Sequence, residues 1–558
     1  MNRRSFLKQG GLAAGAALPL MSTAVRAADA PTRGSGVQSA RGPRRTPPNT
    51  QAGLEPFAGA LTMDLALHLL RRTGFGPRFS EAKAIVNGNP AQIVDAMLAD
   101  QPQPTPPSWA SLQPDLTSAG QTVNATNMTD FRNWWMHIMY TSSNPLAEKM
   151  VLFWTNHFVS ETAKVKVPQY IYWQNYLHRQ YALGNFKDYT KAITIDNAMV
   201  WYLDSYLSTK AKPNENYARE LMELFTIGPF DTTNLTDPTG KTAPVPNYTE
   251  TELQQAARAI TGWVMHTTSG MSTYTTADFR ANLFDSGADK VFMGKTGNWS
   301  YTDIIDTIFE QLDSKTQKNK VALFICTKLY GYFVYDDPGD PTDTSVDYTR
   351  YCNPLNPIIQ GLADTFVSSG FSIRAVLRKL LLSSHFFDAN TIGAQLKSPV
   401  DFILSATRQL ELLTIKDSSL VQQSSALAGA GLSQLGQPPN VKGFPGYRSW
   451  ISTSSLPSRN SITDSITKGT PPPFDMIALA KLYCDNDAAK YNDATALVKA
   501  FADFLSPIPL SATQLTALRD TLLNGAGVND WSTTYPGANI DIQRMLSLIL
   551  RFAEFQLA

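Results

Sequence analysis

The stretch Leu146-Ala-Glu-Lys-Met-Val-Leu-Phe-Trp-Thr-Asn-His-Phe158 carries its apolar side chains three and four residues apart. This spacing places them on one face of an α-helix, because residues i, i+3 and i+4 meet on successive helical turns. The residues of this stripe are Leu146, Met150, Phe153, Trp154, His157 and Phe158. The stretch therefore predicts a helix that packs against a hydrophobic core.

The same helical period recurs through the rest of the chain. Further apolar stripes lie at 253–264, 304–312, 321–333, 373–381 and 540–557. Thr249 and Glu252 form a capping box that predicts a helix start, and Gly228 before a proline predicts a helix end. Strand-like sequence is sparse, and the Thr- and Tyr-rich stretch 271–284 predicts one hairpin. The predicted class is mainly α, a large multi-helix body with a small β-hairpin element.

The N-terminus has the features of a twin-arginine signal peptide. Arg3 and Arg4 precede Phe-Leu-Lys, and an apolar Gly/Ala-rich run follows at 10–21. Small residues flank Arg26 at the expected cleavage positions. The alternative, a membrane anchor, is disfavoured because the run is shorter than a bilayer-spanning helix. Residues 1–28 are therefore predicted to direct export of a folded protein to the periplasm or the cell exterior.

The mature chain divides by composition and periodicity. Residues 29–57 are rich in Pro, Gly, Ser and Arg, which is typical of a flexible tether. Residues 58–470 are predicted to form the main helical domain. Residues 471–558 are predicted to form a C-terminal helical segment that packs on this body.

Composition excludes several function classes. Removing the signal peptide removes four basic residues and no acids, so the formal charge falls from +1 to −3. This charge argues against sequence-independent nucleic-acid binding, which needs a basic surface. Three widely spaced cysteines and six histidines indicate neither a thiolate metal site nor a multi-histidine haem chain. No later apolar run is long enough to span a membrane after processing. Export of folded protein raises the expectation of a cofactor, but the sequence does not identify one.

Eight segments resemble, in order, a bacterial family catalogued only as domain of unknown function number 1800. They lie at 68–76, 146–158, 174–177, 213–228, 257–263, 384–386, 397–399 and 438–446. The resemblance covers roughly residues 60–460. It implies a large, exported, helical protein. It also implies a possible partner, since such proteins are often encoded beside a second exported family, number 1501, which is sulfatase- or phosphatase-like.

The chain departs from the family pattern at two positions. Thr155 stands where many members have a second histidine in a Trp-His-x-His stretch. Phe284 stands before Asp-Ser-Gly where the family usually has histidine. If those histidines are ligands or proton carriers in the family, this chain lacks both.

His157 and Glu161 are the first pair of candidate catalytic residues. They are one helical turn apart, so they are expected to share a helix face if the helix continues. A buried imidazole near a carboxylate can act as a general base or a metal ligand. The alternative is a hydrogen-bonded core histidine, because a buried polar ring needs a partner.

Arg219, Glu220 and Glu223 form the second candidate group, on a helix predicted over 216–227. The apolar residues of this segment are expected to face the core and the two glutamates to lie on the other side. Paired carboxylates can bind a cation or transfer protons. Arg219 could instead pair with Glu215 and Glu223 in a structural lattice. His157, Glu220 and Glu223 together are metal-like in ligand type, although they lie on separate helices.

The glycine-rich stretch 440–450 is a candidate ligand-binding loop. Aromatic faces beside hydrogen-bonding groups suit sugar or peptide chains. The residues that carry this hypothesis are Lys442, Phe444, Tyr447, Arg448 and Trp450. The alternative is a packed loop that fastens the body.

Two further clusters carry weaker hypotheses. The aspartates at 336–347 are of the type that binds calcium, but their spacing is not that of an EF-hand, so a solvated acidic loop is favoured. His68, Arg71 and Arg72 begin the first segment of the resemblance and could bind an anion, or form a solvated basic face.

Two functions follow as hypotheses. The first is an exported helical protein of unassigned biochemical activity that acts as an enzyme in cell-envelope or extracellular polymer metabolism. The second is a non-catalytic periplasmic or surface protein that binds a polymer or a partner through the loop at 440–450. The export machinery of the twin-arginine route is the one partner that the signal peptide predicts directly.

Overall fold

A computed structural model describes residues 52–114, 121–232, 245–267, 273–335, 356–412, 435–444, 446–468 and 474–558. The chain divides into two compact units, Met1–Thr46 and Pro47–Ala558, and all described residues belong to the second. The predicted signal peptide and the acidic stretch 336–347 lie outside the described residues.

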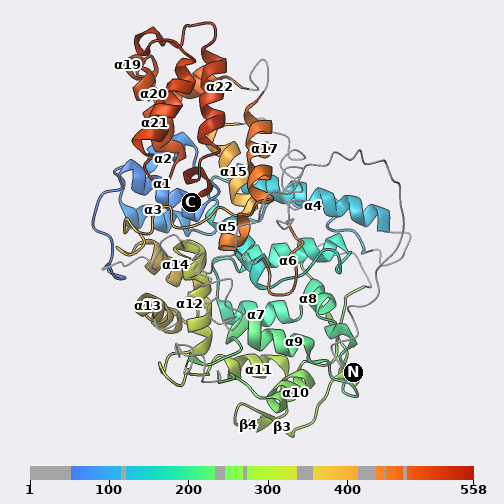
Figure 1. Ribbon diagram of the computed structural model, residues 1–558. Helices are drawn as coiled ribbons and strands as arrows, with labels where there is room; N and C mark the ends of the chain where they lie inside the picture. Colours follow the sequence, from blue (N-terminus) through green and yellow to red (C-terminus); the bar gives the residue numbers. More distant parts are fainter. Residues whose placement is uncertain are drawn as a thin grey trace, which may run out of the picture. The chain divides into compact units, whose positions relative to one another are not determined.

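The predicted class is confirmed, because the described residues form mainly helices, with only two small two-stranded sheets among them (Figure 1). The first helices are α1 (Met63–Thr73), α2 (Phe79–Ile85), α3 (Pro90–Met97), α4 (Gln121–Thr141), α5 (Leu146–His157), α6 (Pro168–Gln180), α7 (Phe186–Thr194) and α8 (Asn197–Tyr202). The central helices are α9 (Glu215–Glu220), the π-helix η3 (Leu221–Thr226), α10 (Glu250–Ala259), α11 (Tyr301–Ile308), α12 (Lys320–Phe333), α13 (Pro357–Ser368), α14 (Ile373–Leu381) and α15 (Pro399–Gln409). The last are α17 (Ser455–Thr467), α18 (Met476–Tyr483), α19 (Ala488–Tyr491), α20 (Ala494–Leu505), α21 (Ala512–Leu523) and α22 (Ala538–Ile549).

Helix starts and ends follow the local sequence. The predicted capping box is present, since the Thr249 side chain accepts from the Glu252 amide and Glu252 accepts from the Thr249 amide. Gly228 follows the last turn of η3 with φ +75°, a conformation that glycine adopts without strain. Both features fix where the segments around the candidate site begin and end.

Strands are few. β1 (Trp263–Val264) pairs antiparallel with β2 (Asp278–Phe279), and β3 (Lys290–Phe292) pairs antiparallel with β4 (Lys295–Gly297). The small β element is thus confirmed. The predicted stretch 271–284 contains β2 but not its partner strand, because β1 lies at 263–264. The hairpin of β3 and β4 was not predicted, because neither strand has more than three residues of alternating pattern.

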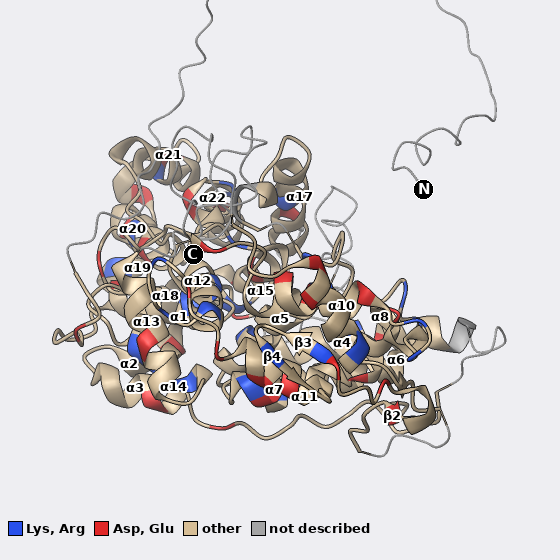
Figure 2. Cartoon of the chain, turned by 90° about the horizontal axis from the view of Figure 1, so that it is seen from below, with Lys and Arg blue, Asp and Glu red and all other residues tan. Residues whose placement is uncertain are grey.

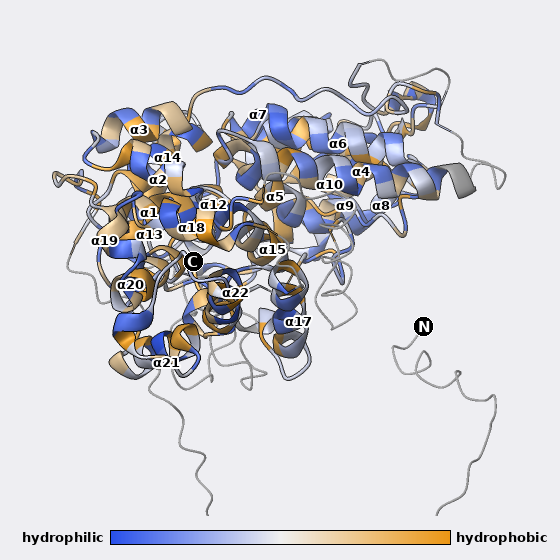
Figure 3. Cartoon of the chain, turned by 90° about the horizontal axis from the view of Figure 1, so that it is seen from above, coloured by the Kyte–Doolittle hydropathy of each residue, from blue (hydrophilic) through white to orange (hydrophobic). Residues whose placement is uncertain are grey.

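The helices are amphipathic, with hydrophobic and hydrophilic residues alternating on the same element (Figure 3). In α5 the predicted stripe is confirmed, since Met150 and Trp154 are fully buried. Trp154 stacks on Phe186 of α7 at 5.5 Å between ring centroids, so α5 lies against α7 as well as α6. Basic and acidic residues are interspersed over the helices (Figure 2), as the near-neutral charge requires. Within the described ranges no helix has both the length and the apolarity to cross a membrane.

The N-terminal and C-terminal helices lie side by side (Figure 1). Arg71 of α1 donates to the Phe504 carbonyl of α20 at 2.6 Å, and Lys83 of α2 pairs with Asp485 after α18 at 3.0 Å. The predicted boundary at residue 470 lies between α17 and α18, outside the described residues, and stays a prediction. Residues 52–57, at the end of the predicted tether, lie along 382–385, where the Phe57 amide donates to the Leu382 carbonyl.

Candidate functional site

The segment that carries Arg219, Glu220 and Glu223 is not one regular helix. α9 ends at Glu220 and continues as the π-helix η3, whereas the sequence predicted a continuous helix over 216–227. π-helical turns are rare and occur frequently at functional sites. The predicted core face is confirmed, because the apolar side chains of the segment are buried: Ala218, Leu221, Met222 and Phe225.

His157 supports the C-terminal end of this π-helix. Its Nε2 lies 3.0 Å from the Phe225 carbonyl, and its Nδ1 lies 3.1 Å from Lys328 Nζ. Because a carbonyl can only accept, Nε2 carries the proton and Nδ1 accepts from Lys328. Burial lowers the pKa of His157 well below its ordinary value, and the charge of Lys328 adds to this shift. His157 is therefore a neutral, hydrogen-bonded core residue.

Lys328 of α12 completes this support. Its Nζ donates to the Leu224 carbonyl at 3.0 Å and lies 4.6 Å from the centre of the Phe324 ring. Burial lowers the pKa of Lys328 to about 7. Two carbonyls that a π-helix leaves open are thus satisfied by His157 and Lys328.

Glu161 does not share a helix face with His157. α5 ends at His157, so Glu161 lies in the turn that follows, and the expectation of a shared face is wrong. Its carboxylate is nevertheless close to the second candidate group. Burial raises the pKa of Tyr202 to about 12, and the charges of Glu161 and Glu220 both add to this rise. The charges of Glu161 and Glu220 therefore both reach the Tyr202 hydroxyl.

Arg219 and Glu223 are paired. Arg219 lies 3.5 Å from Glu215 and 3.9 Å from Glu223, which is the lattice that the spacing allowed, and 3.6 Å from Glu250. Glu223 also accepts a hydrogen bond from the Tyr248 hydroxyl. These contacts hold the Glu223 side chain in place. Its charge acts on Glu220.

Glu220 differs from its neighbours. Among the described residues it forms no hydrogen bond and no ion pair, and its side chain is partly buried. Burial raises the pKa of Glu220 to about 7, the charge of Glu223 adds to the rise, and the charges of Arg219 and Lys442 oppose it. At neutral pH this carboxyl is therefore divided between its protonated and ionised forms.

Lys442 reaches this site on a loop far along the chain. The Phe444 amide donates to Asn156 Oδ1 at 2.6 Å, and Gly443 has φ +81°. A Cβ on Gly443 would lie 2.4 Å from Asn156 Oδ1, so only glycine allows this approach. The contact places Lys442, which is exposed, within electrostatic reach of Glu220.

Two aromatic residues of this loop, Phe444 and Trp450, pack into the body. Trp450 is 8% exposed, and Phe444 packs against it with 6.1 Å between ring centroids. The side chains of Tyr447 and Arg448 lie outside the described residues. The described aromatics therefore fasten the loop, and Lys442 is the described candidate whose charge acts on Glu220.

The described residues contain no group of side chains that would support the weak metal hypothesis. Within the described parts of the chain, no three His, Cys, Asp or Glu side chains are grouped so as to hold an ion. His157 faces carbonyls and a lysine, whereas Glu220 and Glu223 lie beside Tyr202 and Tyr248. The three candidate ligands thus belong to two different environments.

Four residues of the site were not singled out by sequence: Asn156, Tyr202, Tyr248 and Lys328. Lys328 could have been found from the sequence, because it is a lysine on an apolar helical stripe. Asn156 lies inside a segment of the family resemblance. No sequence pattern connects Tyr202 and Tyr248 with the glutamates, since only the folded chain brings them together.

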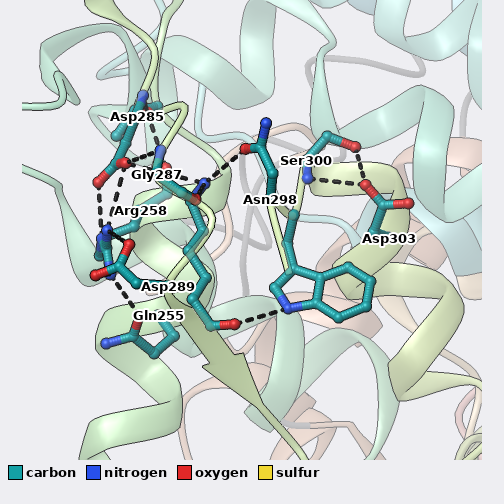
Figure 4. A network of polar contacts seen from close by, with 11 residues as sticks. Gln255, Arg258, Asp285, Gly287, Asp289, Asn298, Ser300 and Asp303 are labelled. Atoms are coloured by element: carbon teal, nitrogen blue, oxygen red, sulfur yellow. Dashed lines mark hydrogen bonds and ion pairs between the residues drawn. The ribbon is translucent and has the colours of Figure 1, made fainter. Parts of the chain in front are cut away.

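The two positions that depart from the family pattern make local contacts, and Phe284 packs against Phe279 with 5.5 Å between ring centroids. Thr155 Oγ1 donates to the Val151 carbonyl at 2.9 Å within α5. Asp285, which follows Phe284, belongs to the polar network of Figure 4, in which Arg258 bonds Asp285 and Asp289 at 2.7 Å each. This network joins α10 to the chain before β3.

No curated protein and no solved structure matches the chain. The family comparison gives one match, which covers residues 68–557 and therefore most of the sequence. It begins at His68 in α1 and includes every candidate residue and the whole C-terminal helical group. The chain belongs to the family described as Protein of unknown function (DUF1800).

Proposed function

We propose that the protein is an exported acid–base enzyme in which Glu220 carries the proton. The observation that supports this most is the state of Glu220, a partly buried carboxyl without a hydrogen-bond partner among the described residues, beside the paired carboxylate of Glu223. A carboxyl that titrates near neutral pH can both give and take a proton during turnover.

The neighbours of Glu220 fit this role. Glu223 pairs with Arg219 and accepts a hydrogen bond from Tyr248, and its charge favours the protonated form of Glu220. Lys442 acts in the opposite direction and keeps part of Glu220 ionised. Glu161, whose charge also acts on Tyr202, is a second carboxylate that can stabilise positive charge or orient water.

The charges of the site favour a neutral or cationic substrate. The glutamates around Arg219 and Lys442 outnumber these two cations: Glu161, Glu215, Glu220, Glu223 and Glu250. Such a field repels polyanions and attracts hydroxyl- or amine-bearing chains. With export by the twin-arginine route to the periplasm or exterior, the substrate class is a cell-envelope or extracellular polymer. An exported partner of family 1501 would act on the same material.

The second candidate function is non-catalytic binding. It is favoured by the pairing of His157 with Phe225 and Lys328, which leaves this histidine a structural role. In that function the exposed Lys442 and the loop that carries it contact a polymer or a partner protein. The two candidates differ in whether the Glu220 carboxyl is needed as a proton carrier or only as a charge.

Incubation of the mature protein with isolated cell-envelope polymers tests the proposal. Wild type is expected to release soluble fragments, and Glu220→Gln is expected to release at least tenfold less while binding the polymer unchanged. Glu250→Gln is the control, because Glu250 is 63% exposed and pairs with Arg219 only at the rim. Equal release by wild type and Glu220→Gln, or binding without release by either, would favour the binding function.

A further inference from the structure

A second concentration of charge lies in the core, where α1, α15, α17 and the C-terminal residues meet. It consists of four cationic side chains. Their exposed fractions are 5% for Arg71, 3% for Arg72, 2% for Lys397 and 0% for Arg459. Three of the segments that resemble the family contribute to this junction, since His68 Nε2 lies 3.0 Å from the Phe386 carbonyl and Lys397 precedes α15.

The hydrogen bonds of these cations go to neutral acceptors. Arg71 donates to the Phe504 carbonyl, and Arg72 donates to the Val334 and Thr391 carbonyls. Lys397 Nζ donates to the Phe555 carbonyl at 2.8 Å, and Arg459 donates to the Lys397 carbonyl at 2.8 Å. The Nε atoms of all three arginines have no hydrogen-bond partner in the described part of the chain. Carbonyls orient these groups but do not cancel their charge.

One partly buried carboxylate, that of Asp401, interacts with this group. Asp401 is electrostatically coupled to Arg72, Lys397 and Arg459. It is already in a salt bridge with Lys149, whose side chain is 7% exposed. Arg71 is coupled to Asp64, which lies at the exposed start of α1. Positive charge therefore exceeds negative charge in this part of the core.

The protonation equilibria agree with an excess of buried positive charge. Burial lowers the pKa of Arg72 to about 9 and that of Arg459 to about 10. Burial also lowers the pKa of Lys397 well below its ordinary value, and the charges of Arg71 and Arg459 add to this shift. The aromatic faces of Phe555 and Phe402, 3.8 Å from Lys397 and 4.8 Å from Arg459, stabilise the cations only in part.

We propose that this junction binds a small oxyanion, phosphate or sulfate, as a structural ligand held by Arg71, Arg72, Lys397 and Arg459. Leaving buried charge uncompensated is strongly destabilising, and an anion among the cations removes that penalty. The planar guanidinium groups suit oxyanions, and their Nε atoms, which lack a partner in the described part of the chain, are the donors still available to an anion. The anion enters as the helices close around it during folding, before export.

Two measurements on the full chain, purified without phosphate or sulfate in the buffers, test this site. Ion chromatography after acid unfolding is expected to detect about one equivalent of phosphate or sulfate per chain. After removal of the anion by unfolding and refolding, micromolar to millimolar phosphate or sulfate is expected to raise the melting temperature in a saturable way. Chloride at equal ionic strength is not expected to do so.

Arg71→Met is the test variant. Arg71 makes one side-chain hydrogen bond within the described chain, to the Phe504 carbonyl, so its replacement disturbs few other contacts. It is expected to weaken the anion dependence of the melting temperature about tenfold. Arg519→Gln is the control, because Arg519 is 34% exposed and pairs with its neighbour Asp520. Absence of bound anion, together with a melting temperature that responds equally to phosphate, sulfate and chloride, would overturn the proposal. So would an identical response in Arg71→Met and Arg519→Gln.

Discussion

At the scale of the residue, the protein separates charge that supports the fold from charge that is available for chemistry. His157 and Arg219 make the contacts that hold the π-helix and α9 in place. Glu220, which directly follows Arg219, forms no hydrogen bond and no ion pair in the described chain. The burial of His157 was predictable from its place on an apolar stripe. Its partners were not, since Phe225 and Lys328 are distant in sequence and only packing brings them together.

Glu220→Gln is expected to stabilise the protein at alkaline pH. The folded state binds the Glu220 proton more tightly than the unfolded state, because burial raises the pKa from 4.5 to about 7. Folding stability therefore falls as pH rises through this range and stays reduced above it. Removing the carboxyl should raise the free energy of unfolding by about 1–2 kcal/mol at pH 8 and change it little at pH 4. Urea unfolding at both pH values measures the difference, and a pH-independent difference would contradict it.

His157→Ala is expected to destabilise the fold by about 3 kcal/mol at pH 8, because it opens a cavity and leaves the Phe225 carbonyl without its donor. The folded-state pKa of His157 is lowered, so the unfolded chain takes up the proton first as pH falls below 6.5. The cost of the substitution should therefore shrink by about 1–2 kcal/mol at pH 5. His137→Ala, at an exposed position of α4, is the matched control for urea unfolding. An equal cost for the two variants would show that His157 is not the buried support described above.

At the scale of the element, the π-helix and the loop at 440–444 build the site. Capping signals predicted where α10 begins, because those signals are local in sequence. The switch from α9 to η3 was not predictable, since the apolar residues of both elements follow one stripe and the difference lies in the hydrogen-bond partners. The contact between Asn156 and the loop was equally hidden, because it joins segments 288 residues apart.

Gly443→Ala tests whether the loop is held against α5 as described. Gly443 and Gly525 both have positive φ, but an added Cβ clashes with Asn156 only at Gly443 and meets nothing at Gly525. Both alanine variants should lose about 1 kcal/mol from backbone strain. Gly443→Ala should lose about 1–3 kcal/mol more from the clash. It should also raise the pKa of Glu220, since Lys442 moves away with the loop. Equal melting temperatures of the two variants would contradict the contact.

At the scale of the whole molecule, the ends of the described chain are tied to its centre. Lys397, just before α15, donates its amide to the Gln556 carbonyl at 2.9 Å and its Nζ to the Phe555 carbonyl. Sequence predicted a mainly helical body from its apolar period. The sequence could not predict the contact between Lys397 and the C-terminal residues. Isolated charged residues such as Lys397 and Arg459 are expected at the surface, but the fold buries both.

Deletion of residues 555–558 is expected to lower the melting temperature by more than 5 °C, because it removes the partners of Lys397 and of the Gln395 carbonyl. Lys83→Ala is the control, since the Lys83–Asp485 pair is half-exposed and should contribute less than about 1 kcal/mol. Differential scanning calorimetry compares the two. A deletion as mild as Lys83→Ala would mean that the C-terminal residues do not close the body.

The central claim is that Glu220 exchanges its proton near neutral pH under the control of Lys442. Titration of the Glu220 carboxyl carbon by NMR, assigned with Glu220→Gln, measures this directly in wild type and in Lys442→Gln. We expect a midpoint near pH 7 in wild type and a higher midpoint in the variant, because the opposing charge of Lys442 is lost. A midpoint near 4.5 that does not move in Lys442→Gln would contradict the account.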